Sequence, residues 1–144
     1  MTETSQQTAP VQETKPGEPI WTSGKRKTAI ARVKTSAGSG KVVVNRKELE
    51  KYFVIERHKN TVLKPVQLVP VSSKYDFSVN VNGGGLCAQS EAVRNGISRA
   101  LAKLDPASKV KLRDEGFLTR DAREVERKKP GQPKARKKFQ WTKR

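Results

Sequence analysis

Few side chains in this sequence could serve as a catalytic base, a nucleophile or a metal ligand. His58 is the only histidine and lies in a strongly polar stretch, so we expect a surface residue rather than a general base. Cys87 is the only cysteine; a thiolate is favoured at a helix start, but the sequence shows no partner base for it. A single cysteine also excludes an intrachain disulfide and a cysteine-based metal site. We therefore predict no enzyme, no metal and no cofactor.

A run of three glycines, Gly83, Gly84 and Gly85, is the motif best suited to contact a phosphate. It stands between an alternating pattern typical of a strand and a periodic pattern typical of a helix. Glycines allow close backbone approach, and a helix N-terminus presents free N–H groups to phosphate. No Gly-Lys-Ser/Thr follows, which excludes a nucleotide P-loop, and Ala88 interrupts the G-x-G-x-x-G spacing. Contact with an RNA phosphate and a merely tight strand–helix connection are both open interpretations.

Two clusters of basic residues could bind a polyanion. Lys25, Arg26 and Lys27 lie at the start of the first expected strand. The second cluster lies in a chain end without acidic residues and comprises Arg127, Lys128, Lys129, Lys134, Arg136, Lys137, Lys138, Lys143 and Arg144. Phe139 and Trp141 stand among these cations, a combination suited to base stacking with phosphate neutralisation. Because no standard RNA-binding signature is present, we expect recognition of the shape and backbone of a structured RNA.

The charge of the chain also favours a nucleic-acid partner. Its 144 residues include 31 Lys and Arg against 14 Asp and Glu, a formal net charge of +17. Such a charge opposes compaction by self-repulsion, which a polyanion relieves. No apolar stretch approaches the roughly 20 residues of a membrane span, and no signal peptide follows Met1. We therefore expect no membrane partner and a cytoplasmic location.

Composition divides the chain into three parts. Residues 1–20 are rich in Thr, Gln, Glu and Pro, with one basic and three acidic residues, and predict a disordered leader. Residues 21–118 contain the apolar periodicity, with 19 basic and 8 acidic residues, and predict one globular RNA-binding domain. Residues 119–144, with 11 basic and 3 acidic residues, show no apolar stripe. They predict an extended basic tail that is disordered without RNA.

Alternation of apolar and polar residues predicts three strands in the domain. The clearest covers residues 75–82. Residues 28–35 form another, with a glycine-containing turn at 36–40 that leads to three valines at 42–44. We expect these two segments to pair as a hairpin over residues 24–45.

Three or four helices complete the expected domain. Asn45, with Glu48 three residues later, predicts the N-cap of a short helix. Residues 54–64 are ambiguous. Pro65 suits the first residue of a further short helix, which Pro70 should end.

The longest helix is expected over residues 86–103. Its apolar stripe has the spacing of a half-buried helix and comprises Val93, Ile97, Ala100, Leu101 and Leu104. Asp-Pro at 105–106 predicts the start of a last helix that carries Val110 and Leu112 inward and ends at Gly116. The predicted fold class is therefore α+β, a small sheet packed with helices.

Three segments of the sequence resemble the S-nine family, the ninth protein of the bacterial small ribosomal subunit. They are Ser23-Gly24-Lys25-Arg26-Lys27, Val81-Asn82-Gly83-Gly84-Gly85, and Gly-Phe-Leu-Thr-Arg-Asp-Ala-Arg-Glu-Val-Glu-Arg-Lys-Lys at 116–129. The resemblance spans about residues 20–144. It implies a left-handed β-α-β type domain in the head of the small subunit, bound to small-subunit ribosomal RNA beside neighbouring head proteins.

The resemblance also implies roles for individual residues. The family's tail threads through RNA, and its last residues approach the anticodon stem of the peptidyl-site tRNA, a role that would fall on Lys143 and Arg144. Contacts to ribosomal RNA would come from Lys25, Arg26, Lys27, Gly83, Gly84, Gly85, Arg120, Arg123, Arg127, Lys128, Lys129, Lys134, Arg136, Lys137 and Lys138. A free nucleic-acid chaperone or nucleoid protein is the alternative hypothesis, and an enzyme built on the glycine turn is a distant third.

Overall fold

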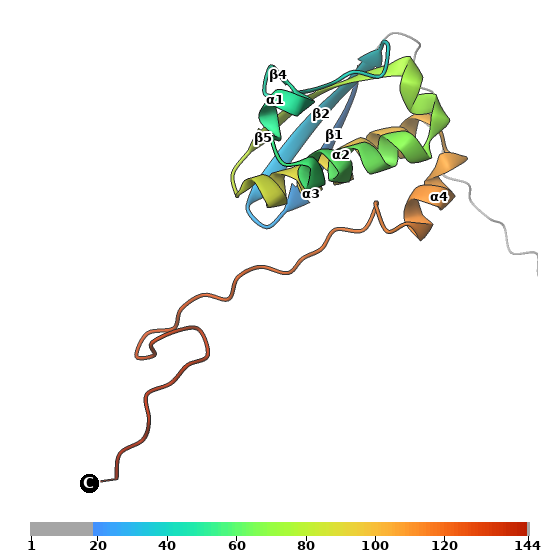
Figure 1. Ribbon diagram of the computed structural model, residues 1–144. Helices are drawn as coiled ribbons and strands as arrows, with labels where there is room; N and C mark the ends of the chain where they lie inside the picture. Colours follow the sequence, from blue (N-terminus) through green and yellow to red (C-terminus); the bar gives the residue numbers. More distant parts are fainter. Residues whose placement is uncertain (1–18, 144) are drawn as a thin grey trace, which may run out of the picture.

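A five-stranded sheet carries its helices on one face in the computed structural model, which describes residues 19–143 (Figure 1). The strands are β1 (Ile20–Arg26), β2 (Ala29–Ala37), β3 (Val42–Val44), β4 (Lys47–Glu48) and β5 (Tyr75–Asn82). The helices are α1 (Leu49–Tyr52), α2 (Glu56–Leu68), α3 (Leu86–Leu104) and α4 (Ser108–Asp114), with a 3-10 turn η1 at Pro70–Lys74. The α+β class is confirmed. The expected leader lies outside the described residues, except for positions 19 and 20.

The strand order β1-β2-β5-β3-β4 shows that the expected hairpin over residues 24–45 is wrong. β2 pairs with β1 on one side and with β5 on the other, whereas β3 pairs in parallel with β5. The loop after β2 crosses the start of β5, where Asp76 Oδ1 accepts the amide N–H groups of Ser39 and Lys41 at 2.8 and 2.9 Å. These two hydrogen bonds hold the pKa of Asp76 below its usual value. They help direct the chain across the start of β5, so that β3 pairs with the far edge of β5 and not with β2.

The sequence patterns missed two strands. β1 presents Thr22, Gly24 and Arg26 toward the helices, so it lacks the apolar alternation that reveals a strand. β4 follows a tight turn in which Asn45 and Arg46 have φ of 48° and 63°. Two positive φ values are typical of a type I′ hairpin turn, in which asparagine is favoured. The predicted N-cap at Asn45 is therefore wrong.

The ambiguous segment before Pro65 is helical. α2 begins at Glu56, and Pro65 is buried inside it rather than starting a helix as predicted. Pro70 does follow the end of α2, because the residue before a proline is disfavoured in the helical region and Val69 is extended. Burial of Val62 and Pro65 on one face shows that tertiary packing determined this helix.

The last two helices agree better with their sequence patterns. The expected apolar stripe of α3 is buried, with only Leu104 partly exposed. In α4, Leu112 is buried as predicted, but Val110 is 64% exposed. Gly116 ends α4 at φ 71°, and its own N–H and that of Phe117 donate to the carbonyls of Arg113 and Leu112. This pair of bonds is the Schellman motif that glycine permits after a helix.

β1 lies directly on α3 through two glycines. A methyl group on Gly24 would overlap the carbonyl oxygen of Ala92 and the amide nitrogen of Gly96. The Thr22 hydroxyl also donates to the Gly96 carbonyl at 2.9 Å. The edge strand and the central helix are therefore in backbone contact, and no larger residue fits between them.

Replacing Gly24 by alanine should lower the free energy of unfolding by about 3 kcal/mol, because backbone atoms on both sides must move apart. Urea unfolding followed by circular dichroism measures the change. Gly116→Ala is the comparison, because a methyl group there meets no atom within 4 Å but takes a left-handed φ. It should lower stability by only about 1 kcal/mol. Equal effects of the two substitutions would contradict the packing argument.

Candidate nucleic-acid interface

One end of the sheet brings together three groups that the sequence singled out separately. Lys27 has φ 49° and forms the turn between β1 and β2. The glycine loop lies against this turn, since a methyl group on Gly83 would approach the Thr28 carbonyl oxygen to 2.5 Å. Arg26 contacts residues 121 and 123, which belong to the segment 119–123, here called the tail root. This turn, the glycine loop and the tail root form the basic end.

The glycine loop needs its glycines and leaves the start of α3 exposed. Gly83 and Gly84 have φ of 77° and 64°, and Gly85 is the N-cap of α3 without a side-chain capping bond. Gln89 Nε2 donates to the Gly83 carbonyl at 3.1 Å, which closes the loop from the helix side. These positive φ angles are enough to explain Gly83 and Gly84 as parts of a tight connection between β5 and α3. It also presents exposed backbone at a helix N-terminus, where a phosphate is stabilised.

Arg26 differs from its two neighbours in its surroundings. Its side chain is only 12% exposed, and its Nε lies 2.6 Å from a Glu91 carboxylate oxygen. One terminal nitrogen lies 3.1 Å from Asp121 Oδ2, and the other donates to the Arg123 carbonyl at 2.7 Å. The guanidinium thus fastens the tail root to β1 and α3. Lys25 and Lys27 have exposed side chains and are better placed for a phosphate.

Asp121 organises the start of the tail. Its carboxylate accepts hydrogen bonds from the side chain and the backbone N–H of Arg123, at distances of 2.8 to 3.1 Å. These bonds, together with the charges of Arg123 and Arg26, hold the pKa of Asp121 far below its usual range. The carboxylate is therefore ionised at neutral pH and ties one tail cation to the body.

The chain beyond the tail root runs away from the body without helix or strand up to residue 143 (Figure 1). Glu126 pairs with Arg136 at 2.8 Å and with Lys129 at 3.2 Å, which lowers the pKa of its carboxyl. The two pairs close a loop around the turn at Pro130–Gly131. Arg120 lies 3.7 Å from Glu124. Exposed pairs of this kind contribute little, so a phosphate can replace the carboxylate.

The other predicted tail cations are exposed. None of them makes an ion pair within residues 19–143. These cations are Arg127, Lys128, Lys134, Lys137, Lys138 and Lys143. Arg144, the second predicted tRNA contact, lies outside the described residues. The tail therefore presents a row of accessible cations alongside Phe139 and Trp141, which are also exposed.

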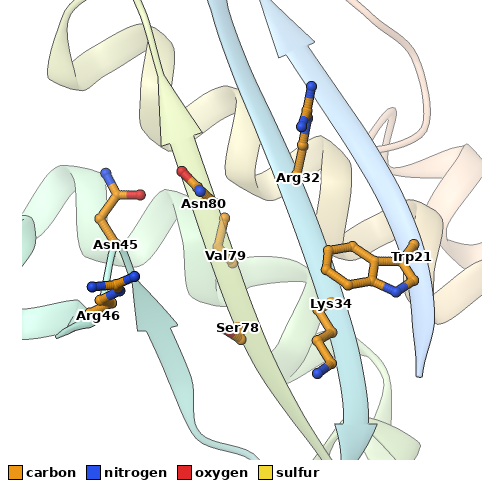
Figure 2. Close-up of a pocket in the computed structure, with 8 residues that line it drawn as sticks. All are labelled: Trp21, Arg32, Lys34, Asn45, Arg46, Ser78, Val79 and Asn80. Carbon is orange, nitrogen blue, oxygen red and sulfur yellow. The ribbon is translucent and has the colours of Figure 1, made fainter. Parts of the chain in front are cut away.

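The sequence reasoning missed a third basic surface, on the sheet face opposite α3, here called the open face. Figure 2 shows Trp21, Arg32 and Lys34 on one side of it and Arg46 on the other, with β5 between them. These residues line a groove of about 550 Å³. Arg32 and Lys34 are exposed and alternate along β2 with the buried residues Ala31 and Val33. The missed strand β1 concealed the position of Trp21.

The two candidate catalytic residues, His58 and Cys87, line one pocket, but no hydrogen bond joins their side chains. His58 is half-buried rather than on the surface, with its ring 6.2 Å from that of Phe53 and its Nδ1 3.5 Å from Ser90 Oγ. The Ser90 hydroxyl donates to the Cys87 carbonyl at 2.8 Å. Among residues 19–143, no three His, Cys, Asp or Glu side chains come together as metal ligands. No helix in this part of the chain is long and apolar enough to span a membrane.

Comparisons with known proteins agree on one family. The model of the family described as ribosomal protein S9/S16 matches residues 24–144. Proteins named small ribosomal subunit protein uS9 from Azobacteroides pseudotrichonymphae and Porphyromonas gingivalis are each 54% identical over 121 residues, which cover 84% of this chain and 94% of theirs. The uS9 protein of Borreliella burgdorferi is 51% identical over 122 residues, covering 85% of this chain and 90% of its own.

Replacing Arg26 by glutamine should release the tail root, because Glu91 and the Asp121 carboxylate then lose their shared cation. We expect faster amide exchange and larger-amplitude motion at residues 119–123, measured by 15N relaxation, and a loss of about 1 to 2 kcal/mol in unfolding free energy. Arg32→Gln removes the same charge from the open face and should leave the tail root unchanged. An immobile tail root in the Arg26 variant would contradict the anchoring role.

Proposed function

The chain belongs to the ribosomal protein S9/S16 family, and from this premise we propose that it is a structural constituent of the small ribosomal subunit that binds the subunit's ribosomal RNA. The family consists of ribosomal proteins rather than enzymes. The observation that carries the proposal is the convergence of Lys25, Lys27, the glycine loop and the tail root at the basic end. A polyanion bound there would meet exposed cations and an open helix N-terminus together.

The proposal assigns different tasks to the body and the tail. The body supplies the basic end, and the tail supplies accessible cations over residues 127–143 that could follow an RNA backbone far from the sheet. We include in the proposal the left-handed crossover that the resemblance implies. The parallel strands β3 and β5 are joined through α1 and α2, so this connection is the β-α-β unit concerned.

The end of the tail is proposed to reach a second RNA. Lys143 and Arg144 would contact the anticodon stem of the peptidyl-site tRNA during translation, as the resemblance implies. The proposed setting is the head of the small subunit in cytoplasmic ribosomes, beside neighbouring head proteins. Co-sedimentation of the protein with the small subunit from native extract at high salt tests this setting. Migration as free protein or with bulk DNA would instead favour a nucleic-acid chaperone or nucleoid protein.

Removing residues 127–144 should flatten the dependence of RNA affinity on salt. Each phosphate neutralised adds about −0.7 to −0.9 to the slope of log affinity against log salt, so the slope should become less negative by several units. Filter binding of small-subunit ribosomal RNA between low and moderate salt measures it. Removing residues 1–19, which carry more acidic than basic residues, is the control and should change the slope little. An unchanged slope after tail removal would exclude the tail as a phosphate-binding element.

Ending the chain at Thr142 should weaken tRNA binding at the peptidyl site without loss of the protein from the subunit. Two charge-assisted contacts would disappear, which corresponds to about 1 to 2 kcal/mol, or roughly five- to thirtyfold in affinity. Reconstituted subunits allow occupancy of the protein and tRNA affinity to be measured separately. Loss of the protein with normal tRNA affinity per occupied particle would make the last two residues an anchor instead.

A further inference from the structure

The open face of the sheet has residues of its own that could bind a ligand, separate from those of the tail and the basic end. The helices cover the opposite face, where Ala31 and Val33 of β2 are buried (Figure 1). On the open face, Trp21 is 60% exposed. Trp21 also precedes the segment matched by the family model, which begins at residue 24.

The groove on this face combines an aromatic ring with three cations. In Figure 2 the indole of Trp21 lies across β2 beside Arg32 and Lys34, and Arg46 lies beyond β5 on the other side. Lys34 Nζ is 5.9 Å from the centre of the Trp21 ring. Asn80 and Ser78 of β5 occupy the floor between them and offer neutral hydrogen-bonding groups. The residues stand on paired strands, which hold them in fixed positions.

The charges of the groove favour an anionic occupant. Three of its eight lining residues are cationic and none is acidic. The carboxylate of Asp76 at the start of β5 is held by the N–H groups of Ser39 and Lys41 and does not line the groove. Cations around an accessible aromatic ring suit single-stranded nucleic acid, in which bases stack and phosphates are neutralised. A double helix would not expose a base for this ring.

We propose that the open face binds an unpaired stretch of RNA, with one base stacked on Trp21 and the flanking phosphates on Arg32, Lys34 and Arg46. This inference rests on the proposed function only in identifying the natural ligand as ribosomal RNA. The site is separate from the tail, whose aromatic residues are Phe139 and Trp141. The tail and the basic end neutralise phosphates of the RNA backbone. The open face would add a contact to an unpaired base, made by residues on rigid strands.

Fluorescence of Trp21 tests the stacking directly. Trp21 and Trp141 are the two tryptophans, so the full chain carrying Trp141→Phe has Trp21 as its only indole. A mixed-sequence single-stranded RNA of about ten nucleotides should quench this fluorescence strongly. Inorganic polyphosphate of matched charge should quench it weakly, because it has no bases. Equal quenching by both probes, or none by the RNA, would overturn the proposal.

Substitutions separate stacking from charge in this background. Trp21→Ala leaves no tryptophan in this background, so its binding of the same RNA is measured by filter binding. The affinity should fall about tenfold without a change in the salt slope, and Trp21→Phe should restore most of it. In a second variant, the three cations are replaced by glutamine, and its salt slope should become less negative by about two to three units. A charge-matched control carries Arg57→Gln, Lys111→Gln and Arg113→Gln on α2 and α4, and none of these residues lines a pocket with Trp21. It should keep the full quenching of Trp21; loss of quenching in this control would contradict a local site.

Binding to whole small-subunit ribosomal RNA distinguishes this inference from the proposed function. If the Trp21→Ala chain binds that RNA and the short RNA as the parent does, the open-face site is wrong and the ribosomal role is unaffected. If only incorporation alongside other small-subunit proteins suffers, the face contacts a protein and the proposal is overturned. If the parent chain fails to bind ribosomal RNA yet the short RNA quenches Trp21, the proposed function fails and the site stands.

Discussion

The backbone contact between β1 and α3 is the constraint on which the rest of this structure depends. Gly24 and Gly96 let the edge strand approach the central helix so closely that a single added methyl group would overlap backbone atoms. The Thr22 hydroxyl bonds to the Gly96 carbonyl, and Arg99 donates to the Ser23 carbonyl at 3.0 Å. These contacts tie β1 to the helix layer along much of its length. β1 can therefore be largely polar and still be held in place, because its backbone, and not a stripe of apolar side chains, packs against α3.

Two functional surfaces follow from the position of β1. Its alternating side chains put Arg26 on the helix side, where it meets Glu91 and the tail root, and Trp21 on the open face, where it meets Lys34. One strand of seven residues therefore anchors the tail at one end and supplies the aromatic residue of the groove at the other. A substitution that separates Gly24 from α3 would therefore displace both Arg26 at the tail root and Trp21 in the groove.

The distribution of carboxylates determines which cations are available to RNA. Glu91 and Asp121 engage Arg26, and Glu126 engages Arg136 and Lys129. The ion pairs of Arg26 with Glu91 and Asp121 are partly sheltered from solvent and hold the tail root against β1 and α3. The ion pairs of Glu126 are exposed, so they contribute little and can be replaced by phosphates at small expense in free energy. The few acidic residues in the tail thus shape the free chain without blocking its cations, whereas Arg26 is committed to holding the tail in place.

Local patterns in the sequence were enough for the elements whose signals are local. They predicted the α+β class, α3 with its apolar stripe, the end of α4 at Gly116 and the positive charge of the tail, because periodicity, turn chemistry and composition depend on neighbouring residues. The pairing of β3 with β5, the strand β1 and the helical state of the segment before Pro65 were decided by tertiary structure. So was the difference between Arg26 and its neighbours Lys25 and Lys27, three basic residues that look equivalent in the sequence. A sequence gives the identity of a side chain, but burial and partners come from segments far along the chain, here Glu91 and residues 121–123.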